Sequence, residues 1–201
     1  MKNFLYLCLI TFFLSNVLFF NTALHSDHHG SDTKSGASVY TNKPLPKKGK
    51  DYKVLGYIKG LKNFVIKYDE KLIRGGDVLN EKGIKALKKF GITTIFSISP
   101  TNTERSLAKQ YGIDLKEIEF LNQKPIPLNI LHMFIKECKD SSKKIYLHCH
   151  GGTHRAGALG VAYRMHVLKW NARRAIKEFA KLGGNLKSDG IIIESVKRYK
   201  M

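Results

Sequence analysis

The sequence is poor in cysteine, with three such residues in a chain of 201. Cys8 lies in an apolar segment near the N-terminus, so Cys138 and Cys149 are the remaining candidates for a disulfide. A helix is expected to end at Cys138, and Cys149 is expected to follow the far end of the next strand. Five strand residues span about 16 Å, whereas a disulfide needs Cα atoms within about 7 Å of each other. The sequence therefore excludes a disulfide framework, and we expect Cys138 to be a buried thiol.

Acidic residues are also scarce. Sixteen Asp and Glu stand against 35 Lys and Arg, which gives a formal net charge of +19. Seven of the basic residues are Arg, so 35 − 7 leaves 28 Lys, and this excess indicates a surface of solvated lysines. Such a charge also attracts anionic substrates, and an anionic membrane surface is a further candidate partner. Nucleic acid is not an expected partner, because aromatic residues are not interleaved with a basic patch and no nucleic-acid-binding module is recognisable.

Long apolar runs are absent apart from one near the N-terminus. Residues 4–20 are almost entirely apolar. This run is long for the apolar part of a signal peptide and slightly short for a membrane-spanning helix. Residues 1–24 are therefore expected to be a signal peptide or a membrane anchor. Both alternatives place the rest of the protein outside the cytoplasm, either exported to the periplasm or secreted, or anchored to the membrane.

Residues 25–53 form a polar segment that is expected to be a flexible linker. A flexible polar tail is favoured there over a metal site. The residues that could bind a metal ion loosely are His25, Asp27, His28 and His29. Residues 54–201 are expected to form a single domain, which is large enough to build a core without disulfides.

Strands and helices alternate along this domain, as judged from the spacing of apolar residues. The helix that begins near Thr101 opens on a capping box that ends at Glu104. The alternation predicts an α/β fold with a mostly parallel central sheet and helices on both faces. In such sheets ligands bind at the carboxyl ends of the strands. Strands are expected at residues 63–68, 71–74, 92–98, 113–120 and 144–148, and helices at 80–90, 101–111, 128–139, 156–168, 171–183 and 188–200.

The segment from residue 148 to residue 157 carries the clearest chemical signal. Cys149 is followed by five residues and then Arg155, at the junction between an apolar run and a helix-compatible run. Gly151 and Gly152 allow the backbone to approach a ligand closely. The N–H groups of such a loop and the positive end of the following helix form a cradle for an anion and favour a thiolate at its mouth. The expected phosphate-binding loop consists of His150, Gly151, Gly152, Thr153 and His154.

Cys149 and Arg155 are the expected catalytic residues. The planar guanidinium of Arg155 can bind two phosphate oxygens at once, and the same donors can hold the charge that develops in the transition state. A thiolate at Cys149 would attack phosphorus to give a phosphocysteine, which water then hydrolyses. This chemistry predicts a cysteine-dependent phosphatase for phosphate monoesters that needs no cofactor and no metal.

The same residues resemble a known family. Cys149, five residues and Arg155, with His148 before them and Gly152 among them, resemble the signature of the protein tyrosine phosphatase superfamily. The resemblance implies a phosphatase-type strand–loop–helix active site. It also implies a supporting role for His148, which would orient the loop and tune the thiol.

Two other stretches are similar to compact dual-specificity-like members of that superfamily. Residues 72–77, Leu-Ile-Arg-Gly-Gly-Asp, are followed by a helix and by a strand that ends at Ile98. Residues 170–183 resemble the helix that follows the loop helix. The resemblance extends from Asn63 to Tyr199. It implies a substrate that is a phosphorylated protein of the phosphotyrosine or dual-specificity type, a phosphoinositide or another anionic phosphate ester.

The sequence departs from the family pattern in two places. Ala156 follows the arginine where the family usually has Ser or Thr, whose hydroxyl assists departure of the thiolate, so slower breakdown of the intermediate is expected. The loop of residues 121–127, where the family usually supplies an aspartic acid to protonate the leaving oxygen, has no carboxylate. Glu117 and Glu119 share one face of an expected strand and are interpreted as a solvated edge. The general acid is therefore unassigned, and phenolic or anhydride leaving groups should be favoured.

Three alternatives to this phosphatase remain open. A rhodanese-like sulfurtransferase also uses a loop cysteine after a strand, but Gly152, Arg155 and the upstream similarity favour the phosphatase. A catalytically weak phosphate-binding module would bind phosphate or vanadate without turnover, and the two departures motivate it. A metal site is disfavoured because Arg155 would repel a cation. The residues of that site would be His148, Cys149, His150 and His154.

Overall fold

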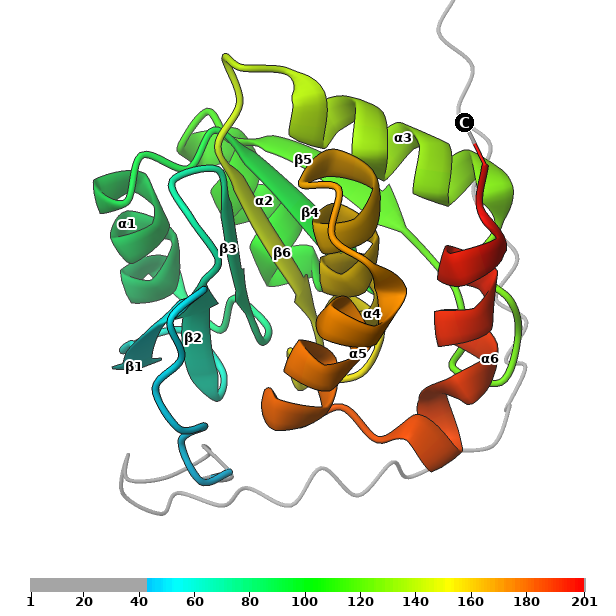
Figure 1. Cartoon of the computed structure of the whole chain (residues 1–201). Helices are drawn as coiled ribbons and strands as arrows, with labels where there is room; N and C mark the ends of the chain where they lie inside the picture. The colour runs from blue at the N-terminus through cyan, green and yellow to red at the C-terminus, as the bar shows by residue number, and fades with distance from the viewer. Residues whose placement is uncertain (1–42, 201) are drawn as a thin grey trace, which may run out of the picture. The chain divides into compact units, whose positions relative to one another are not determined.

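The computed structural model describes residues 43–200, which contain one six-stranded sheet (Figure 1). Its strands are β1 Lys53–Tyr57, β2 Phe64–Lys67, β3 Leu72–Gly75, β4 Thr94–Ile98, β5 Asp114–Ile118 and β6 Ile145–Cys149. They lie in the order β1-β2-β3-β6-β4-β5. β1, β2 and β3 pair antiparallel, whereas β3, β6, β4 and β5 pair parallel. The predicted mostly parallel sheet is confirmed.

Helices cover both faces of the sheet (Figure 1). They are α1 Glu81–Lys89, α2 Asn102–Gln110, α3 Leu128–Lys139, α4 Arg155–Ala162, α5 Ala172–Lys181 and α6 Leu186–Arg198. α1 and α2 share one apolar cluster with Ile95 and Tyr146, and the other four helices share a second cluster with Phe96 and Leu147. Successive side chains of β4 and β6 therefore enter opposite clusters. Because both faces of these two strands are buried, their sequences are mostly apolar and do not alternate regularly between apolar and polar residues.

Most element boundaries lie within two residues of the prediction, and the largest differences are at the helix after the loop and at β1. The helix expected at residues 156–168 ends as α4 at Ala162 and continues as a π-helix, η1 (Tyr163–Val167). α6 begins two residues earlier than expected because Asn185 caps it. The sequence predicts no strand before residue 63, but β1 pairs with β2. A register shift near Gly56 (φ +84°) and half-exposed side chains hide the alternation that marks a strand.

The described part of the predicted linker contacts the domain. The Asp51 carboxylate accepts a hydrogen bond from Arg174 Nη2 at 2.8 Å. Lys43 Nζ donates to Thr153 Oγ1 at 3.1 Å, so this segment reaches the loop before α4. Residues 1–42 lie outside the described part of the chain, and with them the predicted signal peptide or anchor and the possible metal ligands near residue 27. Export and membrane attachment therefore stay predictions. Between residues 43 and 200, no helix has the length and apolar character needed to cross a bilayer.

The two cysteines of the described chain are free and buried. Cys138 lies in α3 and Cys149 ends β6, which confirms that the two do not pair. Burial raises the pKa of the Cys138 thiol. A buried thiol with a raised pKa is inert as a nucleophile, so Cys138 is a structural residue, as predicted.

A buried ion pair joins η1 to α5. Arg164 Nε and Nη2 lie 2.8 and 3.0 Å from the two carboxylate oxygens of Glu178, and the side chains are 3% and 8% exposed. The guanidinium also lies over the rings of Trp170 and Tyr68, at 4.3 and 4.6 Å from their centroids. Nη2 donates in addition to the carbonyl of Asp51 at 2.6 Å. The pair thus holds the segment after α4 against α5.

Replacement of Glu178 should destabilise the fold more than replacement of an exposed acid. Glu178→Ala leaves the buried Arg164 guanidinium with only the Asp51 carbonyl among these oxygen partners, and an uncompensated buried charge costs about 3–5 kcal/mol. Glu194→Ala is the matched control, because Glu194 pairs with Lys197 at an exposed site and such pairs contribute little. Chemical denaturation of both variants measures the difference. Equal losses of unfolding free energy would contradict the assigned role of the ion pair.

Candidate active site

The parallel strands bring three loops to one edge of the sheet. Gly75 at the end of β3 pairs with His148, and Ile98 at the end of β4 pairs with Cys149. The loops after β3, β4 and β6 therefore leave the sheet side by side at its carboxyl edge. This is the edge where ligands bind in sheets of this type. The predicted site residues are brought together at this edge.

The loop between β6 and α4 is held from outside through its carbonyl groups. Asn63 Nδ2 donates to the Gly151 carbonyl at 3.0 Å, and Arg74 Nη1 lies 3.4 Å from the Thr153 carbonyl. The carbonyl and the following N–H of a trans peptide point in opposite directions. The N–H groups of Gly152 and His154 therefore point away from these outer donors. Gly152 N–H is used within the loop, where it donates to Cys149 O at 3.1 Å.

Gly152 makes the tight turn of the loop possible. Its φ is +71°, in the left-handed region that glycine adopts without strain. A Cβ at this position would lie 2.3 Å from the Gly75 carbonyl oxygen, whereas a Cβ on Gly151 would have no neighbour closer than 3.6 Å. The two glycines of the predicted loop are therefore not equivalent. Gly152 is required by packing against β3, and Gly151 is not.

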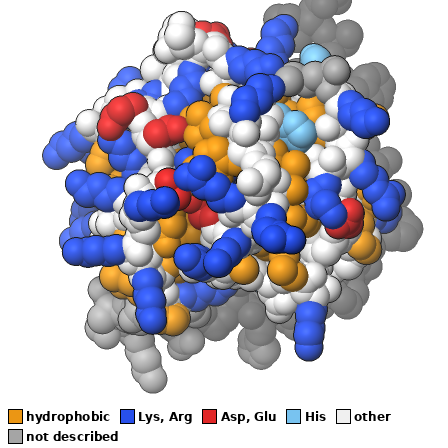
Figure 2. Space-filling view, in the orientation of Figure 1, with side chains coloured by type: hydrophobic (Ala, Val, Ile, Leu, Met, Phe, Trp, Pro, Cys, Tyr) orange, Lys and Arg blue, Asp and Glu red, His pale blue; other side chains and the backbone are white. Residues whose placement is uncertain are grey.

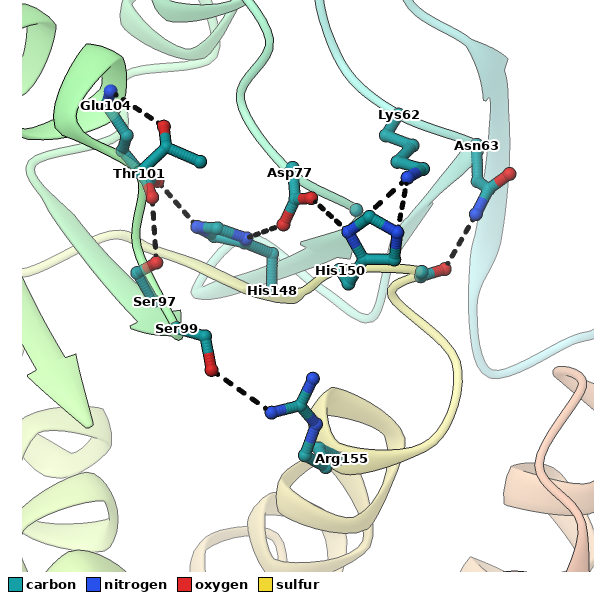
Figure 3. A network of polar contacts seen from close by, with 12 residues as sticks. Lys62, Asn63, Asp77, Ser97, Ser99, Thr101, Glu104, His148, His150 and Arg155 are labelled. Atoms are coloured by element: carbon teal, nitrogen blue, oxygen red, sulfur yellow. Dashed lines mark hydrogen bonds and ion pairs between the residues drawn. The ribbon is translucent and has the colours of Figure 1, made fainter. Parts of the chain in front are cut away.

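His148 lies behind the loop between two carboxylates (Figure 3). Its Nε2 is 2.6 Å from Glu104 Oε1, and its Nδ1 is 3.6 Å from Asp77 Oδ1, just beyond hydrogen-bonding distance. Burial by itself would lower the pKa of His148, but the negative charges of Asp77 and Glu104, together with the hydrogen bond to Glu104, outweigh burial and raise the pKa to about 9. A positive imidazolium therefore lies next in the chain to Cys149 at neutral pH.

The carboxylate of Glu104 corrects one sequence prediction. Thr101 Oγ1 accepts a hydrogen bond from Glu104 N–H at 3.1 Å, as in the expected capping box. The Glu104 side chain does not complete the box, because it is 1% exposed and binds His148 and Ser97 instead. Ser97 Oγ donates to Glu104 Oε2 at 2.8 Å, which leaves both carboxylate oxygens occupied by site residues. Glu104 is thus part of the site and not only of a helix cap.

Arg155 begins α4 and lies on the opposite side of the loop from His148 (Figure 3). Its Nη1 donates to Ser99 Oγ at 3.2 Å. Ser99 directly follows β4 and has a φ of +74°, which is uncommon for a residue with a side chain. The turn after β4 therefore positions a hydroxyl that orients the guanidinium. No signal in the sequence marks Ser99 for this role.

The remaining loop side chains point to different partners. His150 is 71% exposed, with Nδ1 at 2.7 Å from Asp77 Oδ2 and Nε2 at 2.6 Å from Lys62 Nζ. His154 Nδ1 lies 2.7 Å from Asp189 Oδ2. Burial alone would raise the pKa of Asp77, but bonds and charge from the two neighbouring histidines lower it. Because the loop histidines turn to different carboxylates, they do not converge on a metal. Within residues 43–200 no three His, Cys, Asp or Glu side chains are grouped to hold one.

Residues 121–127, before α3, carry no carboxylate. Glu117 lies on β5 at the sheet edge and is bound by Arg105 at 2.9 Å, with both side chains 45% exposed. Glu119 is exposed. The exposure of both side chains agrees with the predicted solvated edge, but β5 ends at Ile118, so Glu119 lies just after the strand and not on it. Asn122 of the loop instead donates from Nδ2 to Asp189 Oδ1 at 3.1 Å. Ala156 is fully buried in α4.

The chain matches a known family over more than half of its length. Residues 78–189 match the family model for the catalytic domain of dual specificity phosphatases. That range contains the loop, the carboxylates of Glu104 and Asp189, and the whole of α4, whereas Asp77 lies one residue before it. No curated protein sequence matches the chain.

Solved structures share the fold at low sequence identity. TpbA of P. aeruginosa has a TM-score of 0.56 and 15% identity, over 68% of this chain and 84% of that chain. The core catalytic domain of the PP-IP phosphatase Siw14 from S. cerevisiae has a TM-score of 0.54 and 16% identity, over 66% and 82%. PTPMT1 in complex with PI(5)P has a TM-score of 0.53 and 17% identity, over 64% and 92%. At these identities the likeness shows the fold.

The two loop glycines give a matched test of the loop geometry. Gly152→Ala should abolish binding of inorganic phosphate or vanadate and lower the melting temperature, because the new Cβ would collide with the backbone of β3. Gly151→Ala should retain anion binding, since its Cβ meets only ordinary contacts. Isothermal titration calorimetry and thermal unfolding measure both effects. Retained anion binding in Gly152→Ala would show that the loop does not depend on this contact.

The raised pKa of His148 predicts a pH-dependent stability. The folded-state pKa of about 9 exceeds the usual 6.5, so the stabilisation is fully present below pH 6.5 and is lost as the pH rises through about 9. This pKa difference corresponds to a loss of unfolding free energy on the order of 3 kcal/mol. Denaturation between pH 6 and pH 10 should show the loss in the wild type and in His132→Asn, but not in His148→Asn. An unchanged slope in His148→Asn would assign the effect to another group.

Proposed function

This chain belongs to the dual-specificity phosphatase family within the protein tyrosine phosphatase superfamily, and on that premise we propose that it hydrolyses phosphate monoesters through a phosphocysteine at Cys149. One observation carries the proposal. Cys149 ends β6 at a loop whose carbonyls are tied outward and whose glycine is fixed against β3, directly before a helix that begins with Arg155. This arrangement supports capture of a phosphate beside a thiol.

Different groups of the site would bind the phosphate and carry out the nucleophilic attack. Loop N–H groups, the start of α4 and Arg155 would bind the phosphate oxygens and hold the charge of the transition state. The positive charge of His148 favours negative charge at the neighbouring sulfur. The Cys149 sulfur attacks phosphorus, the bond to the leaving oxygen breaks, and water then releases phosphate from the sulfur. The methyl group of Ala156 cannot donate a hydrogen bond to the departing thiolate, so we expect slow breakdown of the intermediate.

We propose an anionic phosphate ester as substrate. Lysine side chains flank the loop, since Lys62 contacts His150 and Lys43 contacts Thr153. Figure 2 shows Lys and Arg side chains spread over one face of the molecule, with few Asp or Glu among them. Solved structures of TpbA and PTPMT1 hold pTyr and PI(5)P, respectively. These ligands support a phosphorylated protein or a phosphoinositide as candidate substrates, and the positive surface suits an anionic membrane.

A second candidate function is a catalytically weak phosphate-binding module. The absence of a carboxylate in residues 121–127 and the alanine at position 156 favour it over fast turnover. The family match, by contrast, gives no support to a rhodanese-like sulfurtransferase. Thiosulfate and aryl phosphate are the substrates that separate the two enzymes.

Hydrolysis of p-nitrophenyl phosphate tests the proposal. Cys149→Ser should lower kcat by more than about 10³-fold, because the nucleophile is lost. Arg155→Lys should lower it by about 10²-fold or more, since a single ammonium cannot replace the two-point contact. Cys138→Ala is the matched control and should keep wild-type kcat, because Cys138 is buried in α3.

Acid quenching during turnover should also trap a phosphate adduct on Cys149, detected by mass spectrometry. Turnover that survives Cys149→Ser would contradict the mechanism. Vanadate binding without any turnover by the wild type would favour the phosphate-binding module.

A further inference from the structure

A buried carboxylate lies under the end of the phosphate-binding loop. Asp189 belongs to α6 and is fully buried, and donors from three parts of the chain surround it. His154 Nδ1 and Asn185 N–H lie 2.7 and 2.9 Å from Oδ2. Asn122 Nδ2 and Ser188 Oγ lie 3.1 and 3.2 Å from Oδ1. Asp189 therefore links the loop, the segment after β5 and α6.

Two independent donors settle the direction of the bond between His154 and Asp189. Asn122 Nδ2 donates to Oδ1 and Asn185 N–H donates to Oδ2, whereas the single hydrogen of Ser188 Oγ is shared between Oδ1 and the Asn185 carbonyl. A carboxylate that accepts from amide donors on both oxygens acts as an acceptor, so His154 Nδ1 carries the hydrogen and donates to Asp189. This bond sets the orientation of the ring and directs Nε2 away from α6. The arrangement is that of a carboxylate that holds an imidazole for proton transfer.

His154 differs from the other two histidines of the site. His148 is fully buried between Glu104 and Asp77. His150 has Nε2 against Lys62. His154 is 35% exposed, and in the described part of the chain its Nε2 has no hydrogen-bonding partner. One nitrogen of His154 is thus anchored, and the other is left without a bond among the described residues.

We propose that His154 is the group that protonates the leaving oxygen, with Asp189 as its positioning residue. This inference rests on the proposed phosphatase function. Residues 121–127 contain no carboxylate that could protonate the leaving oxygen, and His154 would take that role. Asn122 of that segment instead donates a hydrogen bond to Asp189. His154 directly precedes Arg155 at the start of α4, so the donor and the phosphate-binding guanidinium are set by the same turn.

The proton balance is complete within the two steps. As the Cys149 sulfur bonds to phosphorus and the bond from phosphorus to the leaving oxygen breaks, His154 Nε2 gives its proton to that oxygen and becomes neutral. In the second step Nε2 takes a proton from the attacking water, the bond from sulfur to phosphorus breaks, and Cys149 returns to the thiolate. Of the charged groups, the Asp189 carboxylate from α6 contacts His154, and Arg155 follows it directly at the start of α4.

Leaving-group dependence separates this role from a structural one. His154→Asn keeps a donor in the place of Nδ1 but removes Nε2. For phenyl phosphate, whose leaving oxygen needs a proton, kcat/KM should fall about 10²-fold or more, whereas for p-nitrophenyl phosphate it should fall less than about tenfold. Asp189→Asn should change the ratio between the two substrates in the same direction. His132→Asn, in α3, is the control and should leave the ratio unchanged.

The outcomes distinguish the two proposals. Equal losses on both substrates in His154→Asn would overturn the role of His154 while the phosphocysteine mechanism stands on the Cys149→Ser result. If the wild type turns over neither substrate, the proposed function falls and this inference falls with it. If Asp189→Asn fails to fold, the ratio of the kcat/KM values for the two substrates in His154→Asn still tests the role of His154.

Discussion

The contact of 2.6 Å between Glu104 and His148 is the interaction on which the rest of the site depends. It joins the start of α2 to the end of β6, directly before Cys149. With Asp77 at 3.6 Å on the other side, the imidazole is held between one carboxylate from α2 and one from the loop after β3. Removal of either carboxylate would leave a buried imidazolium undercompensated, which is costly in a low-dielectric interior. The nucleophile therefore follows a side chain whose charge and position are both fixed.

The parallel register explains why such distant residues meet. β3, β6 and β4 end at the same level of the sheet, so the loops that follow them start from one edge. Each loop contributes a different kind of support. The β3 loop brings Asp77, the β4 turn brings Ser99 to Arg155, and the β3 backbone leaves room only for a glycine at position 152. Rigid strands thus set the geometry, and the loop carries the chemistry.

Acidic residues are scarce, and three of the buried ones share a role at the site. In a chain with 16 acids and a net charge of +19, Asp77, Glu104 and Asp189 are all buried, and each contacts a histidine of the site. Exposed acids such as Glu117 form surface pairs that contribute little. The acids beneath the loop orient imidazoles, while the lysines outside it attract anions.

The sequence by itself determined the α/β fold, the helices and the location of the loop, because apolar periodicity and the spacing of Cys149, Gly152 and Arg155 are local properties. Its prediction for Glu104 was incomplete, since a capping box is a local pattern and the contact with His148 spans 44 positions. Only the tertiary structure could place Ser99 and Asp189 at the site. Their roles arise from which strand and helix ends meet in space, and no spacing along the chain encodes that meeting.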